Sequence, residues 1–520
     1  MSRPSELTTT ERRAFLRHVG SLATLGAGAP LALNLAALGN VAAQVPGSDY
    51  KALVCVFLAG GNDSFNTVLA TDGAPWAAYV ATRKQAPTPI ALRSVGTAPN
   101  GTAAAGTPDR LGGVLGLTSV TPGGPGLALH PLLAGLAQRY NTSRKLALVA
   151  NVGPLLAPTT KAQATASNTV GVLPPKLYSH NDQQSVWQAM SPEGASKGWG
   201  GRLADAVVGA GGVNSQAMFT AISLSGSSIW LNGDIVRPYM VGTGGVVRIG
   251  SGSRLFGSTA AFTAMREVMG TSRGGHVLEA DHAAVVKRSV DAEALLATAV
   301  QPAGTAPWGT PANNYSQSTD PLLQYTSASS PGTLRGNSLA RQLQMVARLI
   351  AARSTLGMRR QVFFVQLGGF DTHDQQNGRH ADLMAQLDQA LAYFDTTLLS
   401  LGVAPQVTTF TASDFGRTFT SNGDGTDHGW GSHQFVLGGA VNGGALYGAW
   451  PSLSQRNPTS NKFDASPDQL GNGVLLPTTS VDQYAATLAR WFGASDTQIA
   501  TLLPNLARFD PASRNLGFLS

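Results

Sequence analysis

Three long apolar runs each lead into a turn that contains an aspartate, and this repeated pattern most constrains the fold. The runs cover residues 50–59, 361–369 and 405–412, and the aspartates that follow them are Asp63, Asp371 and Asp414. Continuous apolar runs are typical of strands buried on both faces of a parallel sheet. Helical patterns, such as residues 132–140 and 381–401, alternate with the runs, as in βαβ units. We therefore predict an α/β fold with a mostly parallel central sheet, helices on both faces and long loop insertions.

Length and composition are compatible with one large domain. The 520 residues exceed the usual domain size, but α/β folds with insertions can remain a single unit. We expect residues 44–520 to form one α/β domain, with an irregular, lid-like insertion around residues 225–335. The single cysteine, Cys55, excludes an intrachain disulfide and a thiolate zinc site. The net charge of +7 is spread over scattered Lys and Arg residues, so no nucleic acid partner is expected.

Residues 1–43 have the features of an export signal. Arg12 and Arg13 precede Phe15 and Leu16, a weakly apolar stretch follows, and residues 41–43 read Val-Ala-Ala. This order resembles a twin-arginine signal with a small-residue cleavage site. We expect export of the folded chain through the twin-arginine translocase to the periplasm or the outside. The stretch is too rich in Ala and Gly for a stable membrane span.

Residues 414–433 form a glycine-rich loop that contains several potential metal ligands. The acidic and imidazole side chains in it are Asp414, Asp424, Asp427, His428 and His433. Carboxylate and imidazole donors suit a hard or borderline divalent cation. The alternative is an ordinary solvated loop, because Gly, Asp and Asn are also common in turns.

A second polar cluster favours the metal interpretation over the solvated loop. Asp371 and His373 follow the run at residues 361–369 directly. Because parallel strands deliver their following loops to one edge of a sheet, these side chains should meet Asp414 there. Asp63 joins them if its run is a parallel strand of the same sheet, although Asp63 is equally suited to cap a helix.

A third polar cluster lies at residues 179–182, directly before a short helical pattern. Ser179, His180 and Asp182 belong to it. A hydroxyl at a helix N-terminus lies in a positive field that suits an oxyanion. The alternative is that Ser179 or Asp182 only caps the helix.

Several motifs of the chain resemble a known family. GGNDSFNT, GGFDTHDQQ, SDFGRT and GTDHGWGSHQFVLGGAV occur in this order, followed by Tyr447-Gly448. They resemble the exported bacterial family called domain of unknown function 1501, over nearly the whole chain. That family is in turn similar to the alkaline phosphatase and sulfatase superfamily. The resemblance implies an alkaline-phosphatase-like fold with two metal ions at strand ends and a nucleophile between them.

The resemblance also implies roles for individual residues. Those that match metal-ligand positions are Asp63, Asp371, His373, Asp414 and His428. By element order the nucleophile corresponds to Ser179, with Ser64 as the alternative. Phe415 stands where the superfamily has a metal-binding histidine. One metal site would then lack a ligand, or would be completed by Asp427, His180 or His433.

Together these features predict an exported, metal-dependent hydrolase of phosphate or sulfate esters, acting on a small-molecule or polymer substrate. The cofactor would be one or two divalent ions, among which Ca²⁺ suits oxygen ligands and Zn²⁺ suits histidines, with Mg²⁺ and Mn²⁺ also open. Ser179 would attack, and Arg417 or Arg202 would stabilise the developing charge. The alternative for Arg417 is an ion pair with a carboxylate. The alternative from another class is a non-catalytic exported protein that binds a metal or another ligand.

Overall fold

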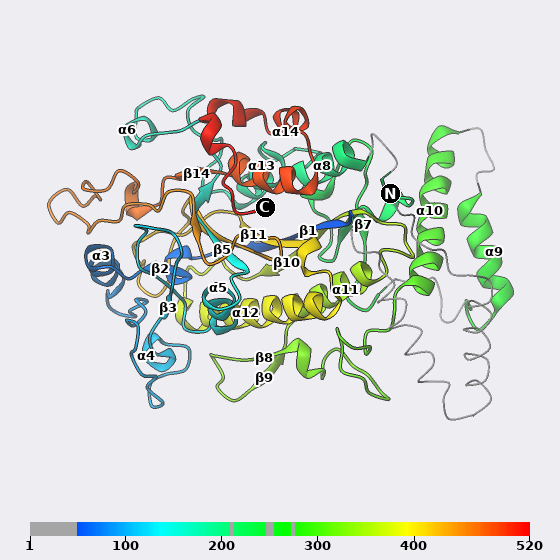
Figure 1. Ribbon diagram of the computed structural model, residues 1–520, viewed down its shortest axis with the longest axis horizontal. Coiled ribbons are helices and arrows are strands. Elements are labelled where there is room, and N and C mark those ends of the chain that lie inside the picture. The colour runs from blue at the N-terminus through cyan, green and yellow to red at the C-terminus, as the bar shows by residue number, and fades with distance from the viewer. Residues whose placement is uncertain (1–48, 209–212, 246–253, 272–275) are drawn as a thin grey trace, which may run out of the picture. The chain divides into compact units, whose positions relative to one another are not determined.

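A nine-stranded sheet lies at the centre of the fold (Figure 1). It is seen in a computed structural model that describes residues 49–208, 213–245, 254–271 and 276–520. The stretch from Tyr50 to Ser520 forms one compact unit. The predicted export signal lies outside the described residues.

The sheet is mixed but mostly parallel. Its path runs through β13 (Leu446–Tyr447), β5 (Leu146–Gly153), β12 (Ser432–Gly438), β11 (Val407–Ser413), β1 (Lys51–Ala59), β10 (Arg360–Gly368), β6 (Ala221–Ser223) and β7 (Tyr239–Met240), while β14 (Thr479–Ser480) pairs with β5. Only β12 among these strands is antiparallel to its neighbours, β11 and β5. The predicted α/β class with a mostly parallel central sheet is therefore confirmed.

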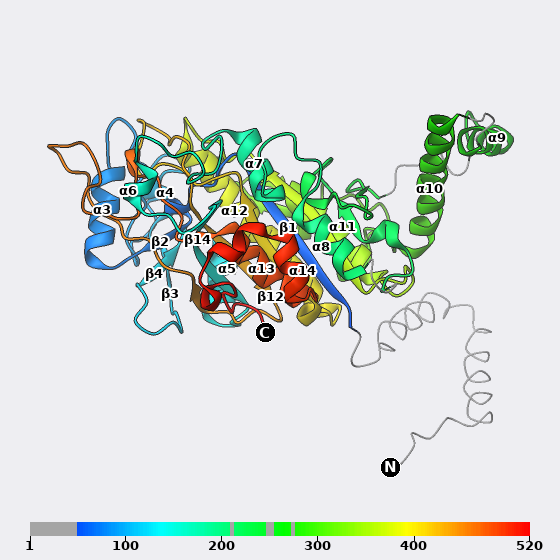
Figure 2. The same cartoon turned by 90° about the horizontal axis from the view of Figure 1, so that it is seen from above.

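Helices cover both faces of the sheet, because side chains of the central strand β1 alternate between two cores. Ala52, Val54, Val56 and Leu58 pack with α5 (Ala134–Asn141), α11 (Ser338–Ala351) and α12 (Gln376–Ser400). Leu53, Cys55 and Phe57 pack with α7 (His180–Ala189), α8 (Trp199–Val208), α13 (Val481–Phe492) and α14 (Asp496–Leu502). This period of two is the geometry of a strand. Figure 1 shows α11 and α12 below the sheet and α13 above it, and Figure 2 shows α13 and α14 in front of β1.

The remaining described elements lie outside the central sheet. They are η1 (Ser64–Asn66), β2 (Val68–Ala70), α3 (Gly73–Arg83), α4 (Pro108–Leu111), β3 (Leu115–Leu117), β4 (Leu127–Leu129), α6 (Lys161–Ala164), η2 (Ala217–Phe219), η3 (Ile229–Leu231), α9 (Thr259–Gly270), α10 (Val277–Ala299), η4 (Pro321–Leu323), β8 (Gln324–Thr326), β9 (Leu334–Gly336), η5 (Ala404–Gln406), η6 (Gly471–Gly473), η7 (Pro504–Arg508) and η8 (Pro511–Ser513). Residues 225–335, expected to be irregular, thus include the helices α9 and α10. No helix among the described residues has both the length and the apolar character to cross a membrane.

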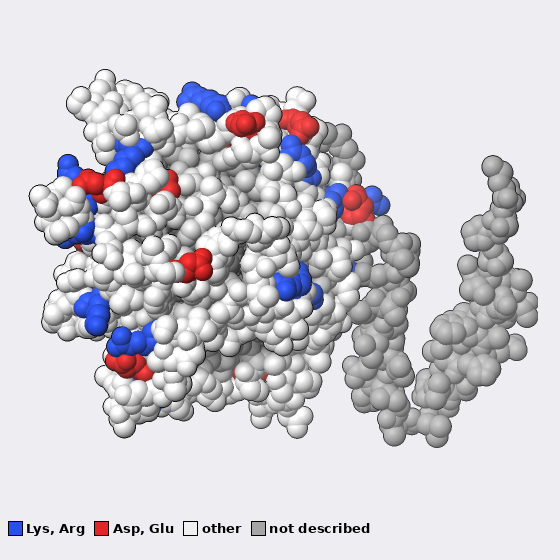
Figure 3. Space-filling view, turned by 60° about the vertical axis from the view of Figure 1, so that its left-hand side comes forward, with Lys and Arg blue, Asp and Glu red and all other residues white. Residues whose placement is uncertain are grey.

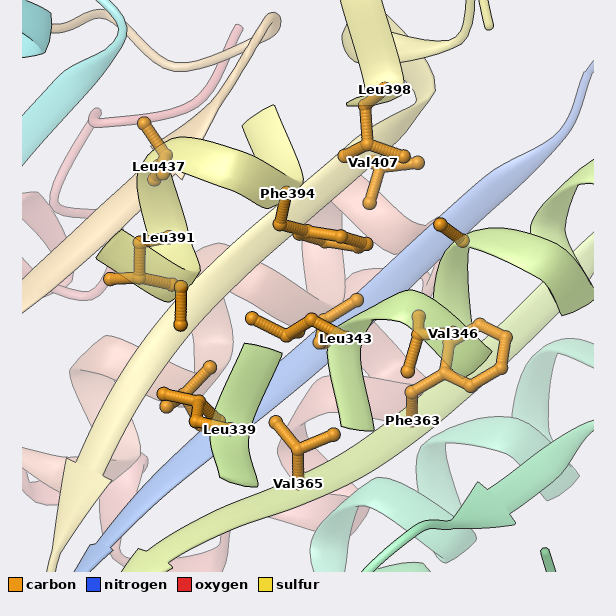
Figure 4. Close-up of a cluster of buried hydrophobic side chains, with 14 of the residues drawn as sticks. Leu339, Leu343, Val346, Phe363, Val365, Leu391, Phe394, Leu398, Val407 and Leu437 are labelled. Carbon is orange, nitrogen blue, oxygen red and sulfur yellow. The ribbon is translucent and has the colours of Figure 1, made fainter. Parts of the chain in front are cut away.

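The core on the α11 and α12 side includes aliphatic and aromatic side chains of α11, α12, β10 and β11. Figure 4 shows Leu343 of α11 and Phe394 of α12 close to Phe363 of β10 and Val407 of β11. By contrast, charged groups are scattered on the molecular face in Figure 3, in keeping with a charged fraction of 12%.

Shortening a side chain in this core should destabilise the fold. Leu343 is fully buried, so Leu343→Ala is expected to lower the free energy of unfolding by about 2–5 kcal/mol, through lost transfer energy and a cavity. Leu399→Ala on the half-exposed side of α12 serves as the control and should change it by less than about 0.5 kcal/mol. Urea denaturation of both variants measures the difference, and equal effects would contradict the assignment of this core.

Candidate metal centre

The candidate site lies where β1, β10 and β11 end side by side. The last residues of these strands are level in the sheet, since Ala59 pairs with Gly368 and Leu58 with Ser413. The loops that follow β10 and β11 therefore start at the same edge, which brings Asp371 and Asp414 together as the sequence predicts. Gly60 has a φ of 115°, and a Cβ on it would collide with the backbone nitrogen of Asp371. A side chain at position 60 would push the turn after β1 away from the loop after β10.

Two further segments complete the site. The N-terminus of α7 contributes His180, and the loop after β11 folds back so that Arg417 and His428 form an isolated antiparallel bridge. His180, Asp371 and His428 place ligand atoms within 4.8 Å of one another. His373 borders them, with its Nε2 atom 3.0 Å from the Asp371 carboxylate.

The three imidazoles have the same hydrogen-bond arrangement, in which Nδ1 faces an oxygen outside the cluster. These oxygens are the Asp414 carboxylate, 2.7 Å from His180, the Tyr178 carbonyl, 2.7 Å from His428, and the Asp427 carboxylate, 3.1 Å from His373. A carbonyl or an ionised carboxylate only accepts hydrogen bonds, so each Nδ1 must carry the hydrogen. When a ring is neutral and Nδ1 carries its hydrogen, Nε2 has a free lone pair.

The Nε2 atoms of His180 and His428 lie beside the Asp371 carboxylate, and the Nε2 atom of His373 borders this group. The Nε2 atoms of His373 and His428 are 2.9 Å apart, and that of His428 lies 3.4 Å from Asp371. The Nε2 atom of His180, 3.5 Å from Asp371, is buried without a hydrogen-bond partner among the described residues. Lone pairs this close repel unless a cation lies among them. Imidazole and carboxylate are ligands of Zn²⁺ and similar ions, so His180, Asp371 and His428 fit one divalent cation, with His373 beside them.

Asp414 holds His180 in place and is not itself among the converging groups. Its carboxylate is fully buried and also accepts from the Gly60 N–H at 3.1 Å and from Gln184 Nε2 at 2.9 Å. The hydrogen bond that His180 donates to Asp414 raises the pKa of His180. An imidazole that donates to a carboxylate and offers its other nitrogen is a common metal-ligand arrangement. The structure thus gives Asp414 an orienting position rather than the predicted ligand position.

Arg417 fixes Asp371 and is turned away from solvent. Its Nη1 donates to Asp371 at 2.6 Å, and its other N–H groups bond Thr426 and the Gly60 carbonyl. Burial alone would raise the pKa of Asp371, but the hydrogen bond and charge of Arg417 outweigh it and lower that pKa. The guanidinium is fully buried, so the structure favours the carboxylate-pairing alternative for Arg417 over contact with a substrate.

Phe415 forms an apolar wall of the cluster. Its ring centroid lies 4.7 Å from that of His180 and 4.6 Å from that of His428. Burial, the largest cause, lowers the pKa of His428, which favours the neutral ring. Of the three residues considered as substitutes for a histidine at position 415, His180 joins the cluster and Asp427 supports it from outside.

Asp63 lies apart from this cluster, although it ends the central strand as expected. It precedes η1, and its carboxylate bonds Arg83 Nη1 at 2.5 Å, Arg83 Nη2 at 2.9 Å and Gln376 Nε2 at 2.6 Å. Burial would raise the pKa of Asp63, but the Arg83 charge and hydrogen bonds outweigh it and lower that pKa. The predicted metal ligand is thus one half of a buried ion pair.

Three residues predicted for catalysis, Ser179, Ser64 and Arg202, form contacts away from the cluster. Ser179 occupies the N-cap position of α7, where its hydroxyl donates to Asp182 at 2.8 Å. Ser64, the alternative nucleophile, is fully buried in η1. Arg202 donates to the carbonyls of Thr501 and Leu502. In the described part of the chain, none of these three side chains forms a hydrogen bond or ion pair with Asp371.

His433 and Asp424 lie outside the converging groups. Asp424 accepts the Gln375 N–H at 3.0 Å, before α12. His433 is buried, stacks on Trp450 with ring centroids 4.2 Å apart and accepts the Asn151 N–H at 3.1 Å. Asp424 and His433 therefore take part in ordinary loop and core contacts, in agreement with the alternative to a metal-ligand role.

The buried histidines should make stability depend on pH. Burial lowers the pKa of His433 to about 3 and that of His380 to about 4, from 6.5 in the unfolded chain. Between pH 6.5 and about 4 the unfolded chain takes up protons that the folded chain does not. The free energy of unfolding should therefore fall as the pH falls, by about 1.4 kcal/mol per pH unit for each histidine.

Urea denaturation across this pH range measures the effect. His433→Asn, whose amide oxygen can still accept the Asn151 N–H, is the matched variant. Its stability should fall less steeply than that of the wild type, and the difference isolates His433. Parallel curves would contradict the prediction.

The comparison with protein families supports the resemblance over the second half of the chain. Residues 281–503 match the family described as "Protein of unknown function (DUF1501)". The matched region contains Asp371, His373, Asp414 and His428, while His180 precedes it. This match supports that family for the chain. No curated protein matches it.

Proposed function

We propose that the protein is an exported, metal-dependent hydrolase of phosphate or sulfate esters with an alkaline-phosphatase-like fold. The observation that supports this most is the convergence of three Nε2 lone pairs on the Asp371 carboxylate. The parallel strands that deliver these groups, and the position of the groups beyond the strand ends, agree with that fold.

His180, His373, His428 and Asp371 are the residues that would hold the cation. A divalent cation bound there would polarise an ester oxygen and lower the pKa of a water molecule. The Asp371 and His373 side chains are 43% and 44% exposed, so the cluster is open to substrate on that side. On the opposite side the Phe415 ring excludes water, and Asp414, Asp427 and the Tyr178 carbonyl keep the three imidazoles in their tautomers.

We further propose that water, rather than Ser179, attacks the ester. The Ser179 hydroxyl donates to Asp182, and Arg417 donates to Asp371, to the Thr426 hydroxyl and to two backbone carbonyls. These two residues therefore position other groups of the site. Ser179→Ala should keep activity within about threefold of the wild type, whereas the loss of a true nucleophile costs several orders of magnitude.

The test is an assay of the mature chain with aryl phosphates and aryl sulfates. Protein stripped with a chelator should be inactive and should regain activity with Zn²⁺, Mn²⁺, Mg²⁺ or Ca²⁺. Ser179→Ala is assayed in parallel with Asp371→Asn, which removes a cation-holding carboxylate and should abolish turnover. Absence of turnover by the wild type at full metal occupancy would reject the hydrolase proposal.

The second candidate function is binding of a metal or another ligand without catalysis. Ser179 and Arg417, both expected to take part in catalysis, are bonded to Asp182 and Asp371 instead, and this favours the second candidate. Wild-type protein that binds the cation, loses it on Asp371→Asn and turns over neither ester class would support this candidate.

A further inference from the structure

Two buried carboxylates, those of Asp63 and Asp414, indicate how many cations the site can hold. The superfamily resemblance implies two metal ions, with Asp63 and Asp414 among their ligands. Both side chains are fully buried, and every oxygen of each carboxylate already accepts a hydrogen bond. These residues do not fit a second metal ion in addition to the one held by the three histidines and Asp371.

The positive charge beside Asp63 is instead the Arg83 guanidinium. A guanidinium has five N–H donors in a planar fork, and each of its nitrogens is bonded here. Beyond Asp63, the acceptors are the Phe419 carbonyl at 3.0 Å, the Thr418 carbonyl at 2.8 Å and the Asn66 side chain at 2.8 Å. Thr418 and Phe419 belong to the loop between β11 and β12, which also contains Asp427 and His428.

Aromatic rings surround this guanidinium. Its central carbon lies 5.1 Å from the ring centroid of Phe65, 5.9 Å from that of Tyr79 and 6.0 Å from that of Phe419. Arg is weakly hydrated and stacks on aromatic faces, whereas Mg²⁺ and Ca²⁺ require a shell of oxygen ligands. The surroundings of Asp63 therefore suit a guanidinium and not a divalent ion.

Side chains connect this ion pair to the candidate metal centre. Gln376 donates to Asp63 at 2.6 Å and accepts from Thr426 at 2.7 Å. Thr426 in turn accepts from Arg417 Nε at 3.2 Å, and Arg417 holds Asp371. The charge of Arg83 is thus fixed to the same framework as the cation-holding carboxylate.

We propose that the centre binds one divalent cation and that the buried Arg83 guanidinium takes the place of a second. This inference rests on the proposed metal centre and specifies its stoichiometry. Arg83 has a positioning role, because it holds Asp63 and the loop that delivers His428.

The experiment is elemental analysis of the full mature chain after saturation with Zn²⁺ and removal of the unbound metal. We expect one zinc per wild-type chain, one per Asp63→Asn chain and none per His180→Ala chain. Two zinc ions per wild-type chain, falling to one in Asp63→Asn, would overturn the inference and leave the metal-dependent hydrolase proposal intact. No zinc in the wild type would reject both the centre and the inference.

A second measurement covers the case in which Asp63→Asn does not fold. Anomalous scattering at the zinc edge from crystals of the wild-type chain locates every bound zinc directly. One peak among His180, His373, His428 and Asp371 supports the inference. A peak bonded to Asp63 overturns it whatever the fate of the variant.

Discussion

Removing the His373 imidazole is expected to weaken Zn²⁺ binding by more than about 100-fold. Even the loss of a residue that only hydrogen-bonds a metal ligand lowers metal affinity by about 10–100-fold. His373→Ala is the most informative ligand variant because the side chain is 44% exposed and its partner Asp427 is 49% exposed. Both can be left to solvent without harm to the fold. Competition with a chromophoric chelator measures the affinity.

Asp427→Asn provides the matched control for His373→Ala. Asp427 accepts the His373 Nδ1–H, and an Asn oxygen can still accept it. The control variant should therefore lose less Zn²⁺ affinity than His373→Ala. Its loss should lie within the range of about 10–100-fold that is typical for residues that hydrogen-bond a metal ligand. Wild-type affinity in His373→Ala, with an unchanged circular dichroism spectrum, would show that the cation is not held by this imidazole.

Replacing Arg83 by methionine should lower the free energy of unfolding by about 3–5 kcal/mol, because it leaves the Asp63 carboxylate buried without its partner. Asp63 and Arg83 have no exposed side-chain surface, so water cannot replace the lost charge. Thermal and urea unfolding of Arg83→Met against the wild type measure this loss.

A double variant separates the ion pair from the general packing of the region. Arg83→Met with Asp63→Leu removes both charges, and hydrophobic replacement of a buried ion pair is often neutral or stabilising. We expect the double variant to recover most of the stability lost in the single one. A single variant that loses less than about 1 kcal/mol would contradict the view that Asp63 is ionised and paired.

The sequence predicts the location of the centre better than the role of each residue in it. Apolar runs that end in Asp63, Asp371 and Asp414 are sufficient to place three loops at one edge of the sheet, because parallel strands align their ends. The pattern of residue types does not show which lone pairs converge. Asp414 and His180 touch, and only the three-dimensional arrangement shows that the imidazole, rather than the carboxylate, faces the cluster.

The sequence pattern also does not show which distant residues form ion pairs. Arg83 lies on α3, 20 residues after Asp63, and no spacing rule connects a strand-ending aspartate with an arginine on a later helix.

The position of β1 in the middle of the sheet determines when the protein can finish folding. Tyr50, next to this strand, bonds Gln361 in β10, 311 positions later in the chain. Segments so far apart pair slowly, because a long loop must first be closed. At a synthesis rate of about 5–20 residues per second, the ribosome needs roughly 15–60 s to make the intervening chain. The loops that bear Asp371 and His428 come later still, so the centre assembles in a late step after most of the chain has been synthesised.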